Sequence, residues 1–262
     1  MENIYSFTLQ DFQIFLLAFF RVTGVIMFSP LFGSQNIPPL LKIMLSLTLA
    51  AILFPVVRTA GVYIPENMLL YIIAVAKEMA VGFVIGFGAT MLFTAVQFGG
   101  QIIDQELGLG LANVIDPISN EQVSIMGQFK LTLAMIIYLI LDGHHFILNS
   151  VVQSFSSIPL LSPTFSPMLG LKLSDAMVGA VFVSAIKIAA PALVTLFLIN
   201  IALAFMARTA PEINVFVVGF TVRLVLGLLV VAIGVELFGY IFEKLHLSSV
   251  KSVGELVSLM GS

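Results

Sequence analysis

The sequence predicts an all-α, integral membrane-type protein, on three observations. The 262-residue chain is 60% hydrophobic and only 10% charged, whereas soluble domains average ~45–50% and ~25%. Its mean hydropathy of +1.13 is too high for a single core of this size to bury the apolar side chains. Six apolar runs approach the ~20 residues that a membrane-crossing helix needs. The surplus apolar surface should therefore face lipid or partner subunits.

The six runs follow one another with turn-forming residues between them, and we expect them to form helical hairpins. They cover residues 12–32, 40–57, 68–98, 126–148, 177–206 and 215–242. The third and fifth runs would exceed a ~30 Å hydrocarbon layer at ~1.5 Å per residue, so they should tilt, kink or leave the membrane. Gly82 and Gly86 in the third run and Pro191 in the fifth favour a kink or a close helix crossing.

A stretch rich in Pro and Ser, residues 158–167, separates four runs from a final pair. This composition is typical of a boundary between parts of a chain, so we divide the protein into residues 1–170 and 171–262. The Lys and Arg residues between the runs are split too evenly between the two sides to decide the orientation in the membrane.

Ionisable side chains, Lys130 among them, lie inside the apolar runs. A central Arg, Lys or Asp costs ~2.5–3.5 kcal/mol on insertion, while each Leu, Ile or Phe contributes only ~0.3–0.6 kcal/mol. We therefore expect such groups to face protein or water inside an assembly and to pair across helices, with the pairs left open. The assigned set is Arg21, Lys77, Glu78, Lys187, Arg223 and Glu236.

The segment after the third run, residues 99–117, is unusual because it places three acids, four Gly and Asp116-Pro117 in an apolar protein. We expect a loop here. Its composition suits either a close-packing backbone that fills a narrow space or a solvated linker. Taken by itself, the composition favours the linker. Gly108-Leu-Gly110 lacks the third Gly of a dinucleotide site, and no Gly-Lys-Ser/Thr phosphate loop is present.

Other chemistry has little support in the residues. The pattern Asp142-Gly-His144-His145 contains metal-binding residue types, but neighbouring His side chains on a helix point apart, and a polar helix end at a membrane boundary is the better interpretation. With no Cys and no Gly-x-Ser-x-Gly elbow, we predict no metal, cofactor or catalytic residue. No basic run fits nucleic acid. Glu78 and Glu236 leave open a proton relay of a transporter.

Motifs along the whole chain resemble the FliR family of flagellar export-gate proteins and its type III secretion relatives. The similar segments are residues 21–24, 29–33, 37–38, 77–78, 99–100, 105–108, 112–117, 142–144, 190–191 and 208–216. The motif residues include Asp116, Pro117, Arg208, Pro211 and Asn214. Departures from the family pattern are Glu212 in place of Gln, Arg223 in place of Lys, and the additional His145. The run from Asn214 to Phe220 resembles the flagellar branch more than the injectisome branch.

The resemblance implies a non-enzymatic subunit of the flagellar protein export gate, at the basal body in the bacterial inner membrane. It implies assembly with FliP-like and FliQ-like subunits, and with a FlhB-like subunit, into a channel for unfolded flagellar proteins. Residues 1–170 would be FliP-like and residues 171–262 a FliQ-like hairpin. Because the family's gate is lifted largely out of the bilayer plane, its buried charges would contact protein.

The resemblance also implies that the loop at about residues 99–121 plugs the closed pore. By position, the plug is formed by Gln105, Glu106, Leu107, Gly108, Leu109, Gly110, Leu111, Ala112 and Asn113. The rival functions are a proton-coupled secondary transporter and, less favoured, a metalloenzyme around Asp142, His144 and His145.

Overall fold

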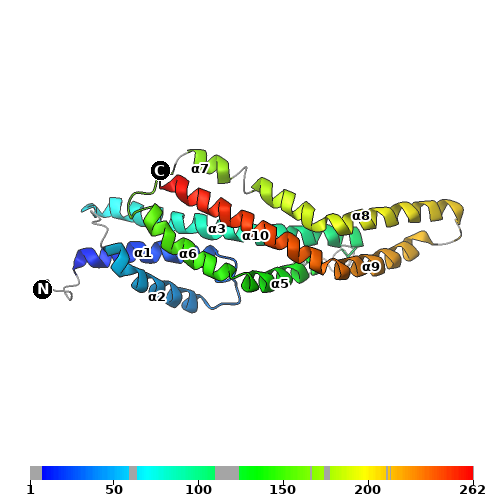
Figure 1. Ribbon diagram of the computed structural model, residues 1–262, viewed down its shortest axis with the longest axis horizontal. Coiled ribbons are helices and arrows are strands. Elements are labelled where there is room, and N and C mark those ends of the chain that lie inside the picture. The colour runs from blue at the N-terminus through cyan, green and yellow to red at the C-terminus, as the bar shows by residue number, and fades with distance from the viewer. Residues whose placement is uncertain are drawn as a thin grey trace. The chain divides into compact units, whose positions relative to one another are not determined.

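The structure, a computed structural model, describes residues 8–58, 64–109, 124–165, 167–173, 178–210, 212 and 214–261. In these ranges the regular secondary structure is helical and contains no strand, which confirms the predicted all-α class. The helices are α1 (Leu9–Phe28), α2 (Pro39–Arg58), α3 (Met68–Leu107), α5 (Ile125–Ile140), α6 (Gly143–Ser157), α7 (Pro167–Leu171), α8 (Gly179–Thr209), α9 (Val215–Ile233) and α10 (Val235–Met260) (Figure 1).

Four of the described helices, α1, α2, α3 and α8, are long and apolar enough to cross a membrane, and two bent pairs bring the possible number of spans to six. The bent pairs are α5 with α6, at 65°, and α9 with α10, at 57°. The fourth and sixth apolar runs, predicted as single helices, are therefore each broken. The first break lies at Asp142, whose φ of 55° is left-handed and ends a helix; the second lies at Gly234.

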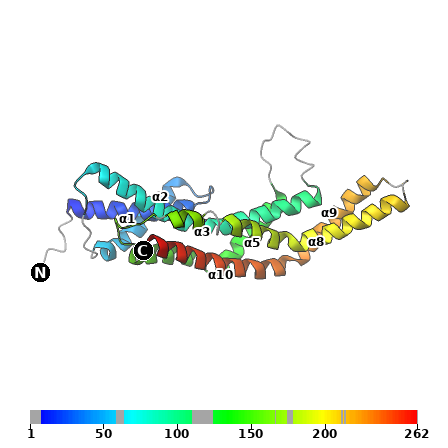
Figure 2. The same ribbon diagram turned by 90° about the horizontal axis from the view of Figure 1, so that it is seen from above.

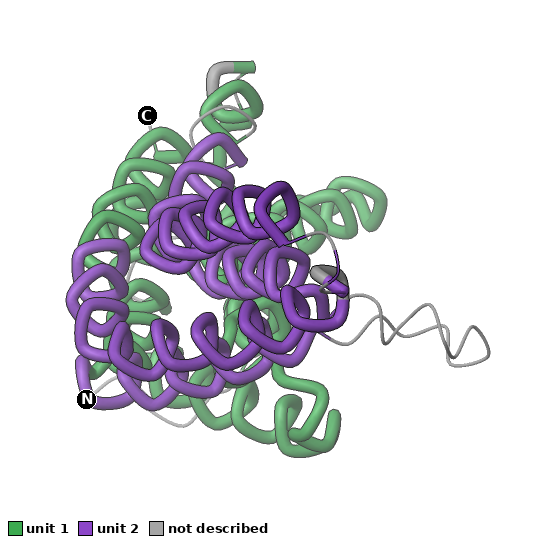
Figure 3. The backbone as a smooth tube through the Cα atoms, turned by 90° about the vertical axis from the view of Figure 1, so that its right-hand side faces the viewer, with its two compact units in different colours: residues 1–91, 142–177, 247–262 green, residues 92–141, 178–246 purple. Residues whose placement is uncertain are grey.

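The chain forms two compact units that alternate along the sequence (Figure 3). Unit 1 comprises residues 1–91, 142–177 and 247–262, and unit 2 comprises residues 92–141 and 178–246. Helices α3 and α10 each contribute residues to both units. The division near residue 170, predicted from the Pro- and Ser-rich stretch and from the resemblance, stays a prediction.

In unit 1, α1 and α2 form an antiparallel hairpin. Thr8 begins α1 with a capping box, because its hydroxyl accepts the Asp11 N–H at 3.2 Å and the Asp11 carboxylate accepts the Thr8 N–H at 2.9 Å. Arg58, the last residue of α2, places its Nε 2.8 Å from Asp11 Oδ1 and so joins the two helix ends. The unit's apolar core contains Ile14, Leu17, Val57, Ile64, Ala74 and Leu160.

Helices α1 and α3 of unit 1 cross with their backbones in contact. A Cβ atom on Gly24 would lie 2.6 Å from the carbonyl oxygen of Met79, and one on Gly86 would lie 2.8 Å from that of Val25. A Cβ atom on Gly82 would lie 2.9 Å from the Cα of Gly24. These distances leave room only for hydrogen, so of the two roles the sequence allows, a kink or a close crossing, Gly82 and Gly86 serve the close crossing.

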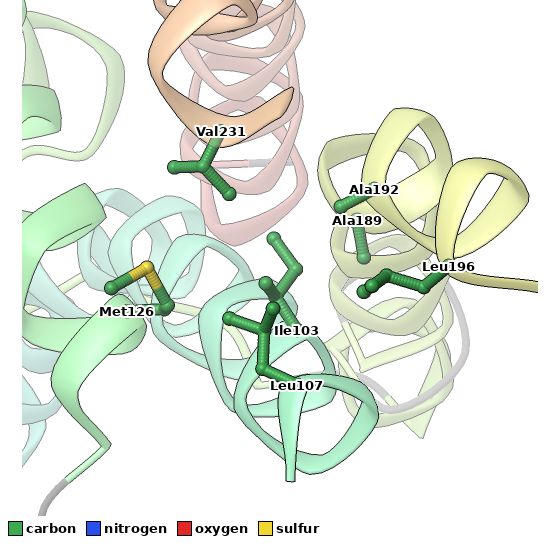
Figure 4. Packing of buried hydrophobic residues seen from close by; sticks show 7 residues of the cluster. All are labelled: Ile103, Leu107, Met126, Ala189, Ala192, Leu196 and Val231. Carbon is green, nitrogen blue, oxygen red and sulfur yellow. The ribbon is translucent and has the colours of Figure 1, made fainter. Parts of the chain in front are cut away.

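Unit 2 is built around a cluster of buried apolar side chains from four helices (Figure 4). Helix α8 pairs with α9 as a hairpin (Figure 2) and packs on the end of α3. The cluster consists of Ile103 and Leu107 from α3, Met126 from α5, Ala189, Ala192 and Leu196 from α8, and Val231 from α9.

Helix α3 continues through Gly99, where the sequence pattern predicts its end, and reaches Leu107. The reason is that Gly99 and Gly100 provide close packing rather than a turn. A Cβ atom on Gly99 would lie 2.9 Å from the Ala185 carbonyl oxygen, and one on Gly100 would lie 2.5 Å from the backbone nitrogen of Gly127. The first part of the predicted loop is therefore helix.

The glycine crossing in unit 1 can be tested with Gly82→Ala. The added methyl group has to displace backbone, so we expect a loss of about 1–3 kcal/mol in the free energy of unfolding, measured by denaturant titration in mild detergent. Gly254→Ala in α10 is the matched control because, among the described residues, nothing beyond its own helix turn lies within 4 Å of its Cβ position. Equal stability of the two variants would contradict the close crossing.

Candidate functional site

The most deeply buried charges of unit 1 form one ion pair between α1 and α3. The side chains of Arg21 and Glu78 are both 0% exposed. Glu78 Oε2 lies 2.5 Å from Arg21 Nη2 and accepts a hydrogen bond from Arg21 Nε at 2.6 Å. The guanidinium carbon also lies 4.5 Å from the centre of the Phe155 ring. Two residues of the predicted charge set are thus brought together.

The remaining polar atoms of this pair bind backbone groups. Arg21 Nη1 donates to the carbonyl oxygens of Ser154 and Ile158 at 3.0 and 2.8 Å, at the C-terminal end of α6. The Ser154 carbonyl also accepts the Ile158 N–H at 2.9 Å, and the helix dipole favours a cation at this end of α6. Glu78 Oε1 accepts the N–H of Leu161 at 3.0 Å. The pair therefore joins α1, α3, the end of α6 and the segment that follows it.

The other four predicted charges have no ionic partner within the described part of the chain. Lys77, Lys187 and Glu236 are exposed. Arg223 is half-buried, and its Nε donates to the carbonyl oxygen of Gly219 in the preceding turn at 3.3 Å. Their pairing with residues of other subunits stays a prediction.

Lys130 is a buried charge that the predicted set omits. It is 6% exposed, and its Nζ lies 4.5 Å from the centre of the Phe238 ring. The buried residues of α5 include Met126, Lys130, Ala134 and Tyr138. This spacing of four residues places them on one helix face, so the periodicity of the run could have identified Lys130 as an inward-facing residue.

The segment predicted as the pore plug begins inside α3. Residues 105–107 form the last helical turn, and Leu107 is fully buried in the core of unit 2. Gly108 follows with a left-handed φ of 79°, and Leu109 donates its N–H to the carbonyl oxygen of Asp104 at 3.0 Å, as at many helix C-termini. Gly110, Leu111, Ala112 and Asn113, like the motif residues Asp116 and Pro117, lie outside the described residues.

Asp104, just before the segment predicted as the plug, forms hydrogen bonds with the start of α5, which follows that segment. Its buried carboxylate accepts a hydrogen bond from Ser124 Oγ at 2.5 Å and from the Met126 N–H at 3.1 Å. Ser124 in turn caps α5 by accepting the Gly127 N–H at 2.8 Å. A carboxylate at the start of a helix is favoured by the free N–H groups there. We call this arrangement the Asp104 clasp; the sequence identified Asp104 only as one acid of the unusual segment.

The motif at residues 208–216 connects α8 to α9. Arg208 is exposed near the end of α8. Asn214 caps α9, and its side-chain oxygen accepts the Val217 N–H at 3.4 Å. Pro211 lies outside the described residues. Helix capping therefore explains why Asn is suitable at position 214.

Asp142, His144 and His145 offer ligand atoms within 4.8 Å of one another. They lie where α6 begins, which is the polar helix end that the sequence predicts. His145 Nδ1 lies 3.1 Å from Asp142 Oδ1, and both side chains are exposed. One carboxylate and two imidazoles are ligands that zinc accepts, but a metal here would have to replace the hydrogen bond between Asp142 and His145.

The contribution of the buried ion pair can be measured with Arg21→Met. Because this change leaves Glu78 buried without its counter-ion, we expect a loss of about 3–5 kcal/mol in the free energy of unfolding in detergent. The double variant Arg21→Met with Glu78→Leu should be less destabilised than the sum of the single variants. Lys172→Met, in an exposed pair with Glu255, is the control and should change stability little. Additive losses would contradict a coupled pair.

Comparison with known proteins places these features in one family. Residues 12–248 match the family described as bacterial export proteins, family 1. The chain is 31% identical to the flagellar biosynthetic protein FliR of Bacillus subtilis, over 95% of this chain and 96% of that protein. It is 24% identical to FliR of Escherichia coli, over 91% and 90%, and 26% identical to FliR of Aquifex aeolicus, over 88% of each. The chain therefore belongs to family 1 of the bacterial export proteins.

Proposed function

We propose that this protein is a subunit of the flagellar type III protein export gate, at the basal body in the bacterial inner membrane. The observation that carries the proposal is the match to bacterial export proteins over residues 12–248, with relatives named flagellar biosynthetic protein FliR along nearly the whole chain. The helices long and apolar enough to cross a membrane support the location. The proposed role is structural rather than enzymatic: the subunit helps to form the channel for unfolded flagellar proteins.

The exposed surface of the chain supports assembly with other subunits. On α8, the side chains of Phe182, Val194, Phe197 and Phe205 are between 52% and 66% exposed. The exposed Lys187 lies on the same helix, and lipid would be a poor environment for its charge. Both features suit a neighbouring helix that carries apolar side chains and a carboxylate.

We assign these neighbours to FliP-like and FliQ-like subunits, with a FlhB-like subunit as a further partner. Under this proposal, residues 1–170 take a position like that of a FliP copy, and residues 171–262 act as a FliQ-like hairpin. The exposed charges Lys77, Lys187 and Glu236 then pair across subunit boundaries. Residues 105–113 contribute to the plug of the closed pore.

The rival function, a proton-coupled transporter, receives less support from the buried acid. Both carboxylate oxygens of Glu78 already accept hydrogen bonds, from Arg21 and from Leu161. A relay acid has to exchange its proton with water or a neighbouring group, and Glu78 is fully buried. The geometry therefore favours a structural role for Glu78.

The assembly can be tested by purification from native membranes. With an affinity tag after Ser262 and gentle solubilisation, we expect one large complex that contains FliP-like and FliQ-like chains, identified by mass spectrometry with their mass ratios. A lone chain or a homodimer would contradict the gate proposal. That result would favour the transporter, which predicts uptake by the purified chain alone in liposomes.

The plug assignment can be tested by deleting residues 110–113. This deletion spares Leu107 in the core and the Asp104 clasp, so the helices on either side keep their packing. If the segment closes the pore, cells that hold the shortened subunit in an assembled gate should leak ions and small solutes, measured as membrane conductance and dye uptake. Unchanged conductance, with the complex recovered in normal yield, would contradict the assignment.

A further inference from the structure

The exposed face of α3 changes from apolar to polar along the helix. Near its start, the exposed large side chains are Met68, Leu69, Leu70, Ile72 and Ile73. Between residues 92 and 107, the exposed residues are Thr94, Gln97 and Gln105. Phe98, Gln101, Ile102 and Glu106 are half-buried. One helix thus carries two kinds of surface, and the second kind extends to Gln105, the first residue of the segment predicted as the plug.

The polar residues form one stripe. Positions 94, 97, 101 and 105 are three or four residues apart, a spacing that places side chains on the same face of a helix. The amides of Gln97, Gln101 and Gln105 form no hydrogen bond with any residue that the structure describes. Within the described part of the chain, the donors and acceptors of these three amides are therefore unused. We refer to Gln97, Gln101 and Gln105 as the amide stripe.

Part of the amide stripe borders a groove between α3 and α8. The groove has a volume of about 280 Å³ and is lined by Thr94, Gln97, Phe98, Gln101, Val181 and Phe182. The rings of Phe98 and Phe182 meet edge to face, with their centres 5.3 Å apart at 88°. Amide groups and an aromatic pair therefore lie side by side within one groove of unit 2.

Hydrocarbon is an unsuitable neighbour for this stripe. Amide groups that leave water without gaining hydrogen bonds are strongly disfavoured, and lipid offers none. The exposed face of α8 shows the contrast, because Val194, Phe197 and Leu198 are each about 60% exposed there. Helix α8 thus presents exposed aliphatic and aromatic side chains, whereas the exposed residues of α3 between positions 92 and 107 are Thr and Gln. This difference indicates two environments, one apolar and one aqueous.

We propose that the amide stripe faces the aqueous path of the export gate and hydrogen-bonds the main chain of an extended polypeptide in transit. This proposal rests on the proposed function. Amide side chains complement peptide N–H and C=O groups whatever the sequence, and main-chain pairing is a general way to bind extended segments. The aromatic pair of Phe98 and Phe182 supplies a contact for apolar side chains of the passing chain.

The absence of cysteine from the sequence allows a clean test by thiol labelling. Gln97→Cys and Gln101→Cys probe the stripe, and Val194→Cys, on the exposed apolar face of α8, is the matched control. Each variant is assembled into the complete gate, and membrane fragments open on both faces receive a membrane-impermeant maleimide. We expect labelling at positions 97 and 101 to be about tenfold faster than at 194, because the reactive thiolate is disfavoured in apolar surroundings.

Contact with a polypeptide is tested in the same variants by a stalled export substrate. A flagellar protein fused to a stably folded domain should remain in the channel and reduce the labelling rate at positions 97 and 101 several-fold. The same flagellar protein without the folded domain is the control and should leave the rate unchanged. All rates are normalised to labelling after denaturation in SDS.

Two results would overturn the proposal. Labelling at position 97 as slow as at 194, in a gate that still exports protein, would show that the stripe is buried against another subunit. Fast labelling that the stalled substrate leaves unchanged would show that the stripe faces water away from the polypeptide. Failure of the proposed function has a different signature, since the FliP-like and FliQ-like chains would then be missing from the purified complex.

Discussion

The buried pair of Arg21 and Glu78 is the interaction on which the rest of unit 1 depends. Charges with no exposed surface need polar partners inside the protein, and here those partners come from α1, α3, the end of α6 and the segment that follows it. The glycine crossing lies one helical turn away, with Gly24 three residues after Arg21 and Gly82 four residues after Glu78. Because side chains at these spacings share a helix face, the glycines bring α1 and α3 close enough for the two charges to meet.

The ionisable groups of this apolar chain are accommodated in three ways. Arg21, Glu78 and Asp104 find partners within their own unit. Lys130 is buried beside an aromatic ring. The exposed charges, such as Lys187 on α8, lie on otherwise apolar helices, where lipid would not solvate them. The paired charges and Lys130 stabilise a single subunit. The exposed charges need either water or an oppositely charged side chain of another subunit.

Sequence reasoning reached the helical class, the approximate position of each span and the family, because long apolar runs and motifs are local properties. It did not reach the partner of Arg21, which lies 57 residues away and depends on how helices cross. It also interpreted Gly99 and Gly100 as loop residues, since composition alone does not distinguish a glycine needed for packing from one needed for a turn. The bend at Asp142 depends on a left-handed backbone conformation, which the pattern of apolar residues does not predict.

Helix α3 connects these observations to function, because it carries the ion pair, the amide stripe and the start of the predicted plug. Its end is held by Leu107 in the core of unit 2, and Ser124 on the far side of the segment is held by the Asp104 clasp. The helical conformation of α3 ends at Gly108, whose positive φ departs from the helix. Leu107 and the Asp104 clasp therefore fix the positions of α3 and α5 on either side of the segment that we propose as the plug.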